Sequence, residues 1–356
     1  MKKILFTGGG SAGHVTLNTG LIPLFQQNGW EVIYIGSEKG IENELIRKIQ
    51  GVRYYPIATG KLRRYFSWEN FRDALRVPLG VFQAWKIIRR EKPDIIFSKG
   101  GFVSLPVVIG GYFAGCRKIY MHESDVTPGL ANKLSLPFVK LFFTTFADTQ
   151  KYVRNQKKVR YVGPVLTERL NNGDAEKART FCHFNEEKPV IMFVGGSLGA
   201  KSINAAVIDH LEHLMDKYQV IHICGKGQIR QTRRPGYAPF EFVDKEFKDL
   251  LALADVVISR SGSNAIFELL SQKKPMLLVP LPSTSSRGEQ SLNALSFKAK
   301  NLAEVLNDSD LAQKLPAAID EVYAKRCELI ANMTAAEWKS TDNHALEEEI
   351  INDAGI

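Results

Sequence analysis

His14, Glu123 and Asp125 are residues in the first half of the chain whose side chains could handle a proton. His14 follows the glycine-rich stretch at 8–13 and begins a predicted helix, where an imidazole could meet a substrate hydroxyl or phosphate. A capping or packed histidine is the alternative interpretation. Glu123 and Asp125 lie in HESDVTPG at 122–129, just before a Pro-Gly turn. These residue types indicate a polar site that could bind or deprotonate a substrate.

Glycine-rich turns between predicted strands and helices could hold a phosphate in this half. KILFTGGGSAGHV at 3–15 satisfies G-x-G-x-x-G after an apolar run, and FSKGGFVS at 97–104 has a second glycine pair. Backbone N–H groups in such turns approach phosphates closely, and the following helix N-terminus adds partial positive charge. A nicotinamide dinucleotide also needs an acidic residue at the tip of the second strand. Since VIYIGS at 32–37 ends in glycine and serine, the motif is weak evidence for NAD.

The second half repeats this design. VGGSLGAKSIN at 194–204 places a glycine turn after an apolar run, and SRSGSNAIFELL at 259–270 opens a predicted helix with small polar residues. Glu268 lies one turn into that helix, within reach of a ribose diol, and a solvated helix carboxylate is an equal alternative. RGEQSLNA at 287–294 adds donors and acceptors of the kind that recognise sugar hydroxyls. We therefore expect a second anion- and sugar-binding site in this half.

Strand signals alternating with helical stretches predict how these loops are positioned. In the first half the predicted strands are KILFTG, EVIYIGS, YYPIA, DIIFS, KIYMHES, LFFTTF and VRYVG. In the second half they are PVIMFV, YQVIHICG, FEFVD, ADVVIS and PMLLVPLP. Such alternation indicates parallel sheets with helical crossovers, whose ligands bind beyond the carboxyl ends of the strands. The fold class is therefore predicted to be α/β, with doubly wound parallel sheets.

Domain boundaries follow from the point at which the pattern restarts, near residue 164. A chain of 356 residues exceeds the usual size of one domain. We predict an N-terminal domain over 1–163 and a C-terminal domain over 164–332, with a hinge in the segment 155–165. The stretch 333–356 is predicted to be a terminal helix.

Positive charge is confined to the first half. Residues 1–164 contain 25 Lys and Arg against 11 Asp and Glu, a net +14, so the remainder of this +9 chain is at −5. The segment 60–92 supplies much of this excess and interleaves nine Lys or Arg with aromatic residues. That mixture suits an anionic bilayer surface or RNA, and an amphipathic core helix with a solvated basic face is the alternative. The candidate membrane-contacting residues are Trp68, Phe71, Phe82 and Trp85.

Taken together and in this order, the motifs resemble the peptidoglycan N-acetylglucosaminyltransferases of glycosyltransferase family 28. The matching segments are FTGGGSAGHV, GKLRRYF, FSKGGFVSLPVV, HESDVTPGLANK, VGGSLGAKSIN, SRSGSNAIFELL and RGEQSLNA, between residues 6 and 294. The resemblance implies a GT-B fold of two Rossmann-like domains. It also implies inverting transfer of N-acetylglucosamine from UDP-GlcNAc to the C4 hydroxyl of the muramoyl residue of lipid I, giving lipid II. The protein would then act at the cytoplasmic face of the membrane, bound peripherally to the anionic inner leaflet.

The resemblance also implies roles for individual residues and for the domains. The C-terminal domain would bind UDP-GlcNAc, and the terminal helix would pack back toward the N-terminal domain, which would bind the acceptor. The donor residues would be Ser197, Val243, Ser263, Asn264, Ala265, Glu268 and Gln290. The acceptor and its diphosphate would meet Gly10, Ser11, Gly13, Gly100 and Gly101, with His14, Glu123 and Asp125 as the catalytic candidates. His14 is the leading base or acceptor-positioning group and Asp125 the competitor; no cofactor, metal or nucleic acid is expected.

One segment departs from the family pattern. Relatives usually carry G-[SN]-P-[VI]-R after the hinge strand, and its arginine contacts the donor, whereas this chain reads VGPVLTERL at 162–170. Leu166 takes the arginine's place, and Arg169 follows three residues later. Either Arg169 substitutes from a shifted loop or donor affinity is reduced.

Three alternative functions remain open from the sequence. A GT-B enzyme with another lipid acceptor would keep the donor motifs but would differ in FSKGGFVS and HESDVTPG. A basic membrane- or RNA-binding module would explain the charge but would not need glycine loops in both halves. A NAD-dependent dehydrogenase would bind nicotinamide.

Overall fold

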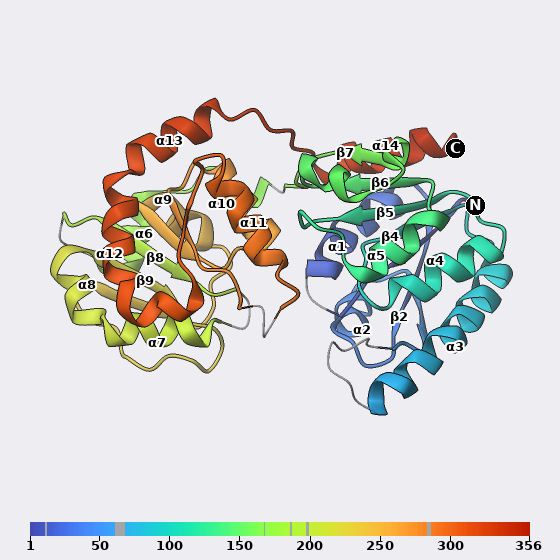
Figure 1. Ribbon diagram of the computed structural model, residues 1–356, viewed down its shortest axis with the longest axis horizontal. Helices are drawn as coiled ribbons and strands as arrows, with labels where there is room; N and C mark the ends of the chain where they lie inside the picture. The colour runs from blue at the N-terminus through green and yellow to red at the C-terminus, as the bar shows by residue number, and fades with distance from the viewer. Residues whose placement is uncertain (11–12, 61–67, 167, 186, 197–198, 283–285) are drawn as a thin grey trace. The chain divides into compact units, whose positions relative to one another are not determined.

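The computed structural model describes residues 1–356 except 11–12, 61–67, 167, 186, 197–198 and 283–285. The chain forms two compact units (Figure 1). The first combines Met1–Leu166 with Lys339–Ile356, and the second comprises Thr167–Trp338. The boundary after Leu166 follows the segment 155–165 directly, and the second unit extends to Trp338, beyond the predicted end at residue 332.

The first unit is built on a parallel sheet of seven strands among the described residues, in the order β3-β2-β1-β4-β5-β6-β7. The order places β1 at the centre, between β2 and β4, with Phe6 paired to Tyr34 on one side and to Phe97 on the other. The reversal of strand order beside β1 is the position where open α/β sheets bind ligands. The strands are β1 Lys3–Thr7, β2 Glu31–Ser37, β3 Val52–Ile57, β4 Ile95–Ser98, β5 Ile119–Glu123, β6 Leu141–Thr144 and β7 Val159–Tyr161.

Helices cover both faces of this sheet because the central strands are apolar on both sides. Successive strand residues point to opposite faces, so Ile4 and Phe6 belong to one hydrophobic core and Leu5 to the other. The first core includes residues of α1 and α14, and the second includes residues of α3 and α4. The helices are α1 Gly13–Gln27, α2 Ile41–Ile46, α3 Trp68–Glu91, α4 Ser104–Phe113, α5 Leu130–Ser135 and α14 Asn343–Ala354, with 3₁₀ turns at Leu136–Phe138, Ala147–Tyr152 and Gln156–Lys158.

The C-terminal segment belongs to the first unit and is not one helix. Residues 333–335 finish α13 (Arg326–Ala335) in the second unit, whereas Lys339–Ile356 belong to the first unit, where α14 packs against α1. Its Asp353 accepts a hydrogen bond from the hydroxyl of Tyr120 at 2.7 Å, and the side chain of Asn28 donates to Glu347 at 2.9 Å. The prediction of one helix from residue 333 was wrong because the polar stretch 336–342 has no helical hydrogen bonding.

In its described residues, the second unit repeats the design with a six-stranded parallel sheet in the order β10-β9-β8-β11-β12-β13. Its strands are β8 Val190–Val194, β9 Gln219–Ile223, β10 Tyr237–Phe240, β11 Val256–Ser259, β12 Met276–Leu278 and β13 Glu304–Val305. The strand predicted at 240–244 lies earlier in the chain, because β10 ends at Phe240, where the predicted strand was expected to begin. The helical elements are the 3₁₀ turn Glu168–Leu170, α6 Ala175–Cys182, α7 Lys201–Asp209, α8 Leu211–Lys217, α9 Phe247–Leu253, α10 Ser263–Ser271, α11 Glu289–Lys298, the 3₁₀ turn Asp308–Asp310, α12 Leu311–Ala324 and α13.

A buried histidine makes the second unit sensitive to acid. His222 on β9 is 1% exposed and lies 3.0 Å from both the hydroxyl of Tyr237 and Oδ1 of Asn204. Burial lowers the pKa of His222 to about 4. An unfolded imidazole binds its proton near pH 6.5, so the unfolded state holds more protons between pH 6.5 and 4, and stability falls as the pH drops through this window.

We therefore expect His222→Gln to flatten the acid limb of the stability curve. In wild type, His222 should lower the free energy of unfolding by about 1.4 kcal/mol for each unit by which the pH falls between 6 and 4.5. Urea titrations at pH 7, 6 and 5 measure the slope, with His213→Gln as the exposed-histidine control. Equal slopes in the two variants would contradict the assignment.

Candidate active site

The first glycine loop, Gly8–Gly10, is fixed at the carboxyl end of β1 by groups from β2, from the loop after β4 and from α2. The hydroxyl of Tyr34 donates to Gly8 O at 2.7 Å, and Gly9 N donates to Gly100 O at 3.3 Å. Gly10 N donates to the carboxylate of Glu42 at 3.1 Å. A Cβ on Gly101, whose φ is +86°, would lie 2.1 Å from Gly9 O. Only glycine therefore allows the loops after β1 and β4 to touch.

His14 lies in the first turn of α1, beside these two loops. Its Nδ1 is 3.1 Å from Gly9 O, and it would lie 3.1 Å from a Cβ on Gly101. Because a carbonyl oxygen can only accept, this hydrogen bond assigns the proton of a neutral imidazole to Nδ1. Nε2 is then the nitrogen with a basic lone pair.

Glu123 and Asp125, the two carboxylate candidates, differ in their surroundings. Glu123 is 4% exposed, and its carboxylate accepts hydrogen bonds from the backbone N–H groups of Ser124, Asp125 and Gly129 and from the side chain of Asn132. These contacts fit a carboxylate that shapes the loop. Asp125 contacts the 3₁₀ turn after β6 through its backbone oxygen, which accepts from Thr149.

Lys99, after β4, is a buried cation at the same edge of the sheet. Its ammonium group donates to Nδ1 of His122 at 3.1 Å and to the hydroxyl of Ser124. Burial lowers the pKa of Lys99 to about 8, while the nearby charges of Glu123 and Asp125 oppose that shift. The loops after β1, β4 and β5 thus meet around one positive charge.

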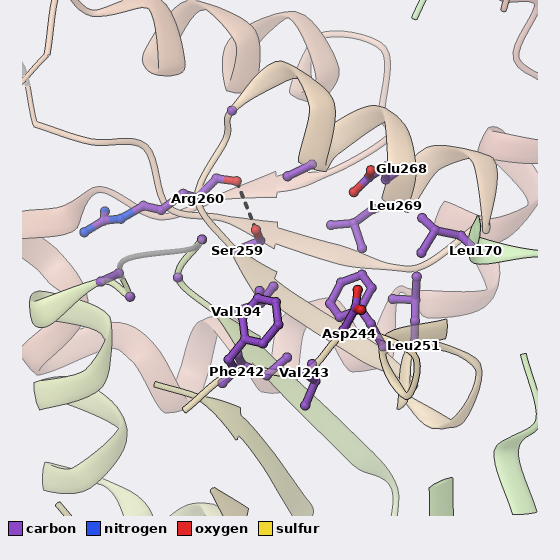
Figure 2. Close-up of a pocket in the computed structure, with 18 of the residues that line it drawn as sticks. Leu170, Val194, Phe242, Val243, Asp244, Leu251, Ser259, Arg260, Glu268 and Leu269 are labelled. Carbon is purple, nitrogen blue, oxygen red and sulfur yellow. Dashed lines mark hydrogen bonds between the residues drawn. The ribbon is translucent and has the colours of Figure 1, made fainter. Parts of the chain in front are cut away.

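In the second unit, the carboxyl ends of the strands open into a pocket of about 1150 Å³. Val194 of β8, Ile223 of β9 and Ser259 of β11 contribute to its floor. Figure 2 shows Glu268 and Leu269 of α10 on one side and Phe242 and Val243, from the loop after β10, on the other.

The pocket gathers most of the residues expected to hold the donor. Those among its lining residues are Arg169, Val243, Ala265, Glu268 and Gln290. Ser263 and Asn264 begin α10 next to it, while Ser197 lies outside the described residues, as does Ser11 of the first unit.

Arg169 and Glu268 form an ion pair in this pocket, with Nη2 of the arginine 2.6 Å from Oε1 of the glutamate. Arg169 is 62% exposed and Glu268 is 23% exposed, so solvent screens the pair and a competing ligand could displace it. Glu268, the carboxylate expected to accept hydrogen bonds from ribose hydroxyls, is thus paired with Arg169, the arginine whose role the sequence left open.

Gln290 and the start of α10 present hydrogen-bonding groups to the pocket. The side-chain oxygen of Gln290 accepts from Leu281 N at 3.2 Å, which directs its amide NH₂ group as the donor end. Gly262 caps α10 in an extended conformation, and no side chain caps the helix. The first-turn N–H groups are therefore oriented as they are in anion-binding helix N-termini.

Arg260 is a pocket residue that the sequence interpretation missed. Its guanidinium donates to Oδ1 of Asp308 at 2.5 Å and to the hydroxyl of Ser202 at 2.7 Å, so it ties β11 to α7. The sequence did offer one signal for Arg260, its position directly after a predicted strand. Glu42 was missed as well, because nothing in the sequence ties α2 to the first glycine loop.

A metal-binding cluster and a membrane-spanning helix are both absent from the described part of the chain. It contains no group of three or more His, Cys, Asp or Glu side chains arranged to hold a metal ion. Its helices are too short or too polar to span a bilayer.

Two α/β units with parallel sheets, each with a glycine-rich turn after a central strand, match the GT-B fold. Residues 4–144 match the glycosyltransferase family 28 N-terminal domain, and residues 190–348 match its C-terminal domain. The chain belongs to glycosyltransferase family 28.

Named relatives and solved structures agree with this assignment. A Geobacillus thermodenitrificans protein is 50% identical over 335 residues, covering 93% of this chain and 94% of its own. A Clostridium tetani protein is 47% identical over 342 residues, covering 95% of each chain. Both are named UDP-N-acetylglucosamine–N-acetylmuramyl-(pentapeptide) pyrophosphoryl-undecaprenol N-acetylglucosamine transferase. The crystal structure of Acinetobacter baumannii MurG has a TM-score of 0.76 at 20% identity, covering 99% of this chain and 100% of its own.

Proposed function

We propose that this protein transfers N-acetylglucosamine from UDP-GlcNAc to the C4 hydroxyl of the muramoyl residue of lipid I, forming lipid II with inversion at the sugar. The observation that carries the proposal is the similarity to two relatives that bear the corresponding name. Each is about 50% identical to this chain over nearly its full length. The geometry supports it with a nucleotide-sized pocket in one unit and a histidine between glycine loops in the other.

The pocket of the second unit is the proposed UDP-GlcNAc site. The N-terminus of α10, at Ser263, Asn264 and Ala265, would face the diphosphate, because its N–H groups and dipole favour an anion. Glu268 would accept the ribose hydroxyls, and Gln290 would donate to the sugar. The backbone of Val243 would meet uracil, and Ser197 would join the diphosphate contacts.

The first unit is the proposed acceptor site, with His14 as the base. Nε2 of His14 would take the proton of the C4 hydroxyl as that oxygen attacks C1 of N-acetylglucosamine. The bond from C1 to the β-phosphate oxygen breaks, and its electron pair leaves with UDP. Gly10, Ser11, Gly13, Gly100 and Gly101 would line the acceptor diphosphate, and Asp125 would position the sugar.

Release of UDP places negative charge on the diphosphate. The N-terminus of α10 offers oriented N–H donors for that charge. Arg169 adds a full positive charge to the same pocket, within a displaceable ion pair.

Contact with an anionic membrane surface is the proposed means of reaching a lipid-borne acceptor. On α3, Leu79 is 50% and Phe82 59% exposed, and the Phe82 ring stacks on Trp85 at a centroid distance of 5.7 Å. The helix α4 adjoins α3 (Figure 1), and Phe113 at its end is 65% exposed. The side chains of Trp68 and Phe71 lie outside the described residues.

We expect the double variant Leu79→Ser, Phe82→Ser to co-sediment about tenfold less with phosphatidylglycerol vesicles, since each side chain gains roughly 1.5–3 kcal/mol on full burial. Both side chains are about half exposed in the free protein, so folding should survive, as thermal melting would check. Ile330→Ser, which replaces a 39% exposed apolar residue of the second unit, is the control. Unchanged binding by the folded double variant would refute this surface.

Transfer itself is tested with UDP-GlcNAc labelled in the sugar and a short-chain lipid I analogue. Formation of a product with the lipid II mass supports the function. Folded protein that binds UDP-GlcNAc but glycosylates a diacylglycerol instead would point to a different lipid acceptor.

A further inference from the structure

Glu42 is the one buried carboxylate of α2, and the proposed reaction does not use it directly. Its side chain is fully buried and accepts hydrogen bonds from Gly10 N at 3.1 Å, Ser37 N at 3.1 Å and the Ser37 hydroxyl. A Cβ on Gly9 would lie 2.4 Å from its carboxyl carbon. The carboxylate therefore fills the underside of the first glycine loop, next to Gly9, and accepts the N–H of Gly10.

Gly10 N and Gly9 O belong to the same peptide group, which links Glu42 to His14. The N–H side of this peptide donates to the carboxylate of Glu42, and its carbonyl side accepts from Nδ1 of His14 at 3.1 Å. The order of groups is carboxylate, peptide, imidazole. We propose that Glu42 is a positioning residue that orients and polarises His14 through the Gly9–Gly10 peptide, a role that rests on the proposed function of His14 as base.

Two physical effects would act along this chain of groups. Hydrogen bonds in series polarise one another, so a carboxylate on the N–H side makes the carbonyl a stronger acceptor. The stronger acceptor fixes the Nδ1–H tautomer and stabilises the imidazolium that forms when Nε2 takes a proton. A carboxylate that contacts the imidazole directly has these two effects in the Ser-His-Asp triad.

The surrounding structure holds the peptide in the required orientation. Gly8 O accepts from the hydroxyl of Tyr34, and Thr7 O accepts from the side chain of Asn18 at 3.2 Å. Gly10 has a φ of +87°, a conformation that glycine adopts without strain. The titratable groups near the loop come from several elements: Tyr34 on β2, Tyr54 on β3, Lys99 after β4, and His122, Glu123 and Asp125 on β5 and its loop.

The variant Glu42→Gln tests the coupling because it replaces the carboxylate with a neutral group of similar shape. Glu44→Gln is the matched control, since Glu44 lies on the same helix, is exposed and pairs with Lys48 at 3.1 Å. In ¹⁵N-histidine-labelled protein without substrates, His14 is assigned by comparison with His14→Gln. Its ring-nitrogen shifts then report both tautomer and pKa.

We expect wild type and Glu44→Gln to show neutral His14 protonated at Nδ1. Glu42→Gln should have a lower His14 pKa, and its kcat should fall about tenfold with an unchanged KM for UDP-GlcNAc. Identical His14 spectra and pKa in Glu42→Gln and Glu44→Gln would overturn the proposal. So would a wild-type His14 protonated at Nε2, a result that needs no variant to fold.

The spectra separate this proposal from the proposed function. If Glu42→Gln shifts the His14 pKa but His14→Ala retains full transfer activity, the coupling stands and the catalytic role of His14 fails. If the pKa is unaffected while His14→Ala is inactive, His14 remains the base and Glu42 only supports the loop.

Discussion

His14→Ala is expected to lower kcat for transfer by about 10²–10⁴-fold, the usual contribution of a general base. The KM for UDP-GlcNAc should stay nearly constant, because the proposed donor contacts all lie in the second unit. Steady-state kinetics with a soluble lipid I analogue measures both constants. His213→Ala, which removes an exposed histidine of α8, is the control.

If Asp125 rather than His14 is the base, the same kinetic measurements should give the opposite result. Asp125→Asn would cause the larger loss of kcat if Asp125 took the proton, and His14→Ala would then affect mainly the KM for the acceptor. Glu123→Gln should be judged separately, since its four hydrogen bonds predict a loss of folded protein.

Glu268→Ala is expected to raise the KM for UDP-GlcNAc by about 10- to 100-fold with little change in kcat. A hydrogen bond to a charged group contributes about 1.5–3 kcal/mol, and the ribose contact should be the same in the ground and transition states. Isothermal titration with UDP and with uridine provides the binding constants. Glu328→Ala, at an exposed position of α13, is the control.

Arg169→Met extends this test to the residue paired with Glu268. If Arg169 substitutes for the arginine that Leu166 replaces, this variant should weaken UDP binding much more than uridine binding. If Arg169 only blocks the carboxylate of Glu268 through their ion pair, uridine should bind Arg169→Met more tightly than it binds wild type. Equal affinities for wild type and Arg169→Met would exclude both roles.

Strands were predictable where several apolar or β-branched residues follow one another, because a strand buried on both faces needs them. This rule found the buried strands among the described residues of the first unit, and aromatic and β-branched residues also indicated the partly exposed edge strands β3 and β7. The rule placed β10 too late in the chain, because YAPF includes a proline and FEF has the stronger aromatic signal. The two-residue strand β13 carries too little pattern to detect.

The pocket of the second unit could be predicted where its lining residues belong to contiguous motifs. Arg169, Val243, Ala265, Glu268 and Gln290 come from four separate segments, yet all line one pocket. Parallel strands bring their following loops to one edge, so strand prediction implied that the segments of Ala265, Glu268 and Gln290 would meet. Arg169 and Val243 were named only from the family resemblance. The pairing of Arg169 with Glu268 was not predictable, because it depends on where a 3₁₀ turn places a long side chain.

By itself, the sequence determined the two parallel-sheet units, the glycine turns and the membership of a glycosyltransferase family. These features depend on local residue patterns and on ordered motifs along the chain. Only the tertiary structure decided that Glu42, from α2, fills the underside of the first glycine loop and is connected to His14 through one peptide group. It likewise decided that the non-helical segment 336–342 separates α13 of the second unit from α14 of the first. Contacts between segments distant in sequence depend on the packing of the whole unit, which no local pattern encodes.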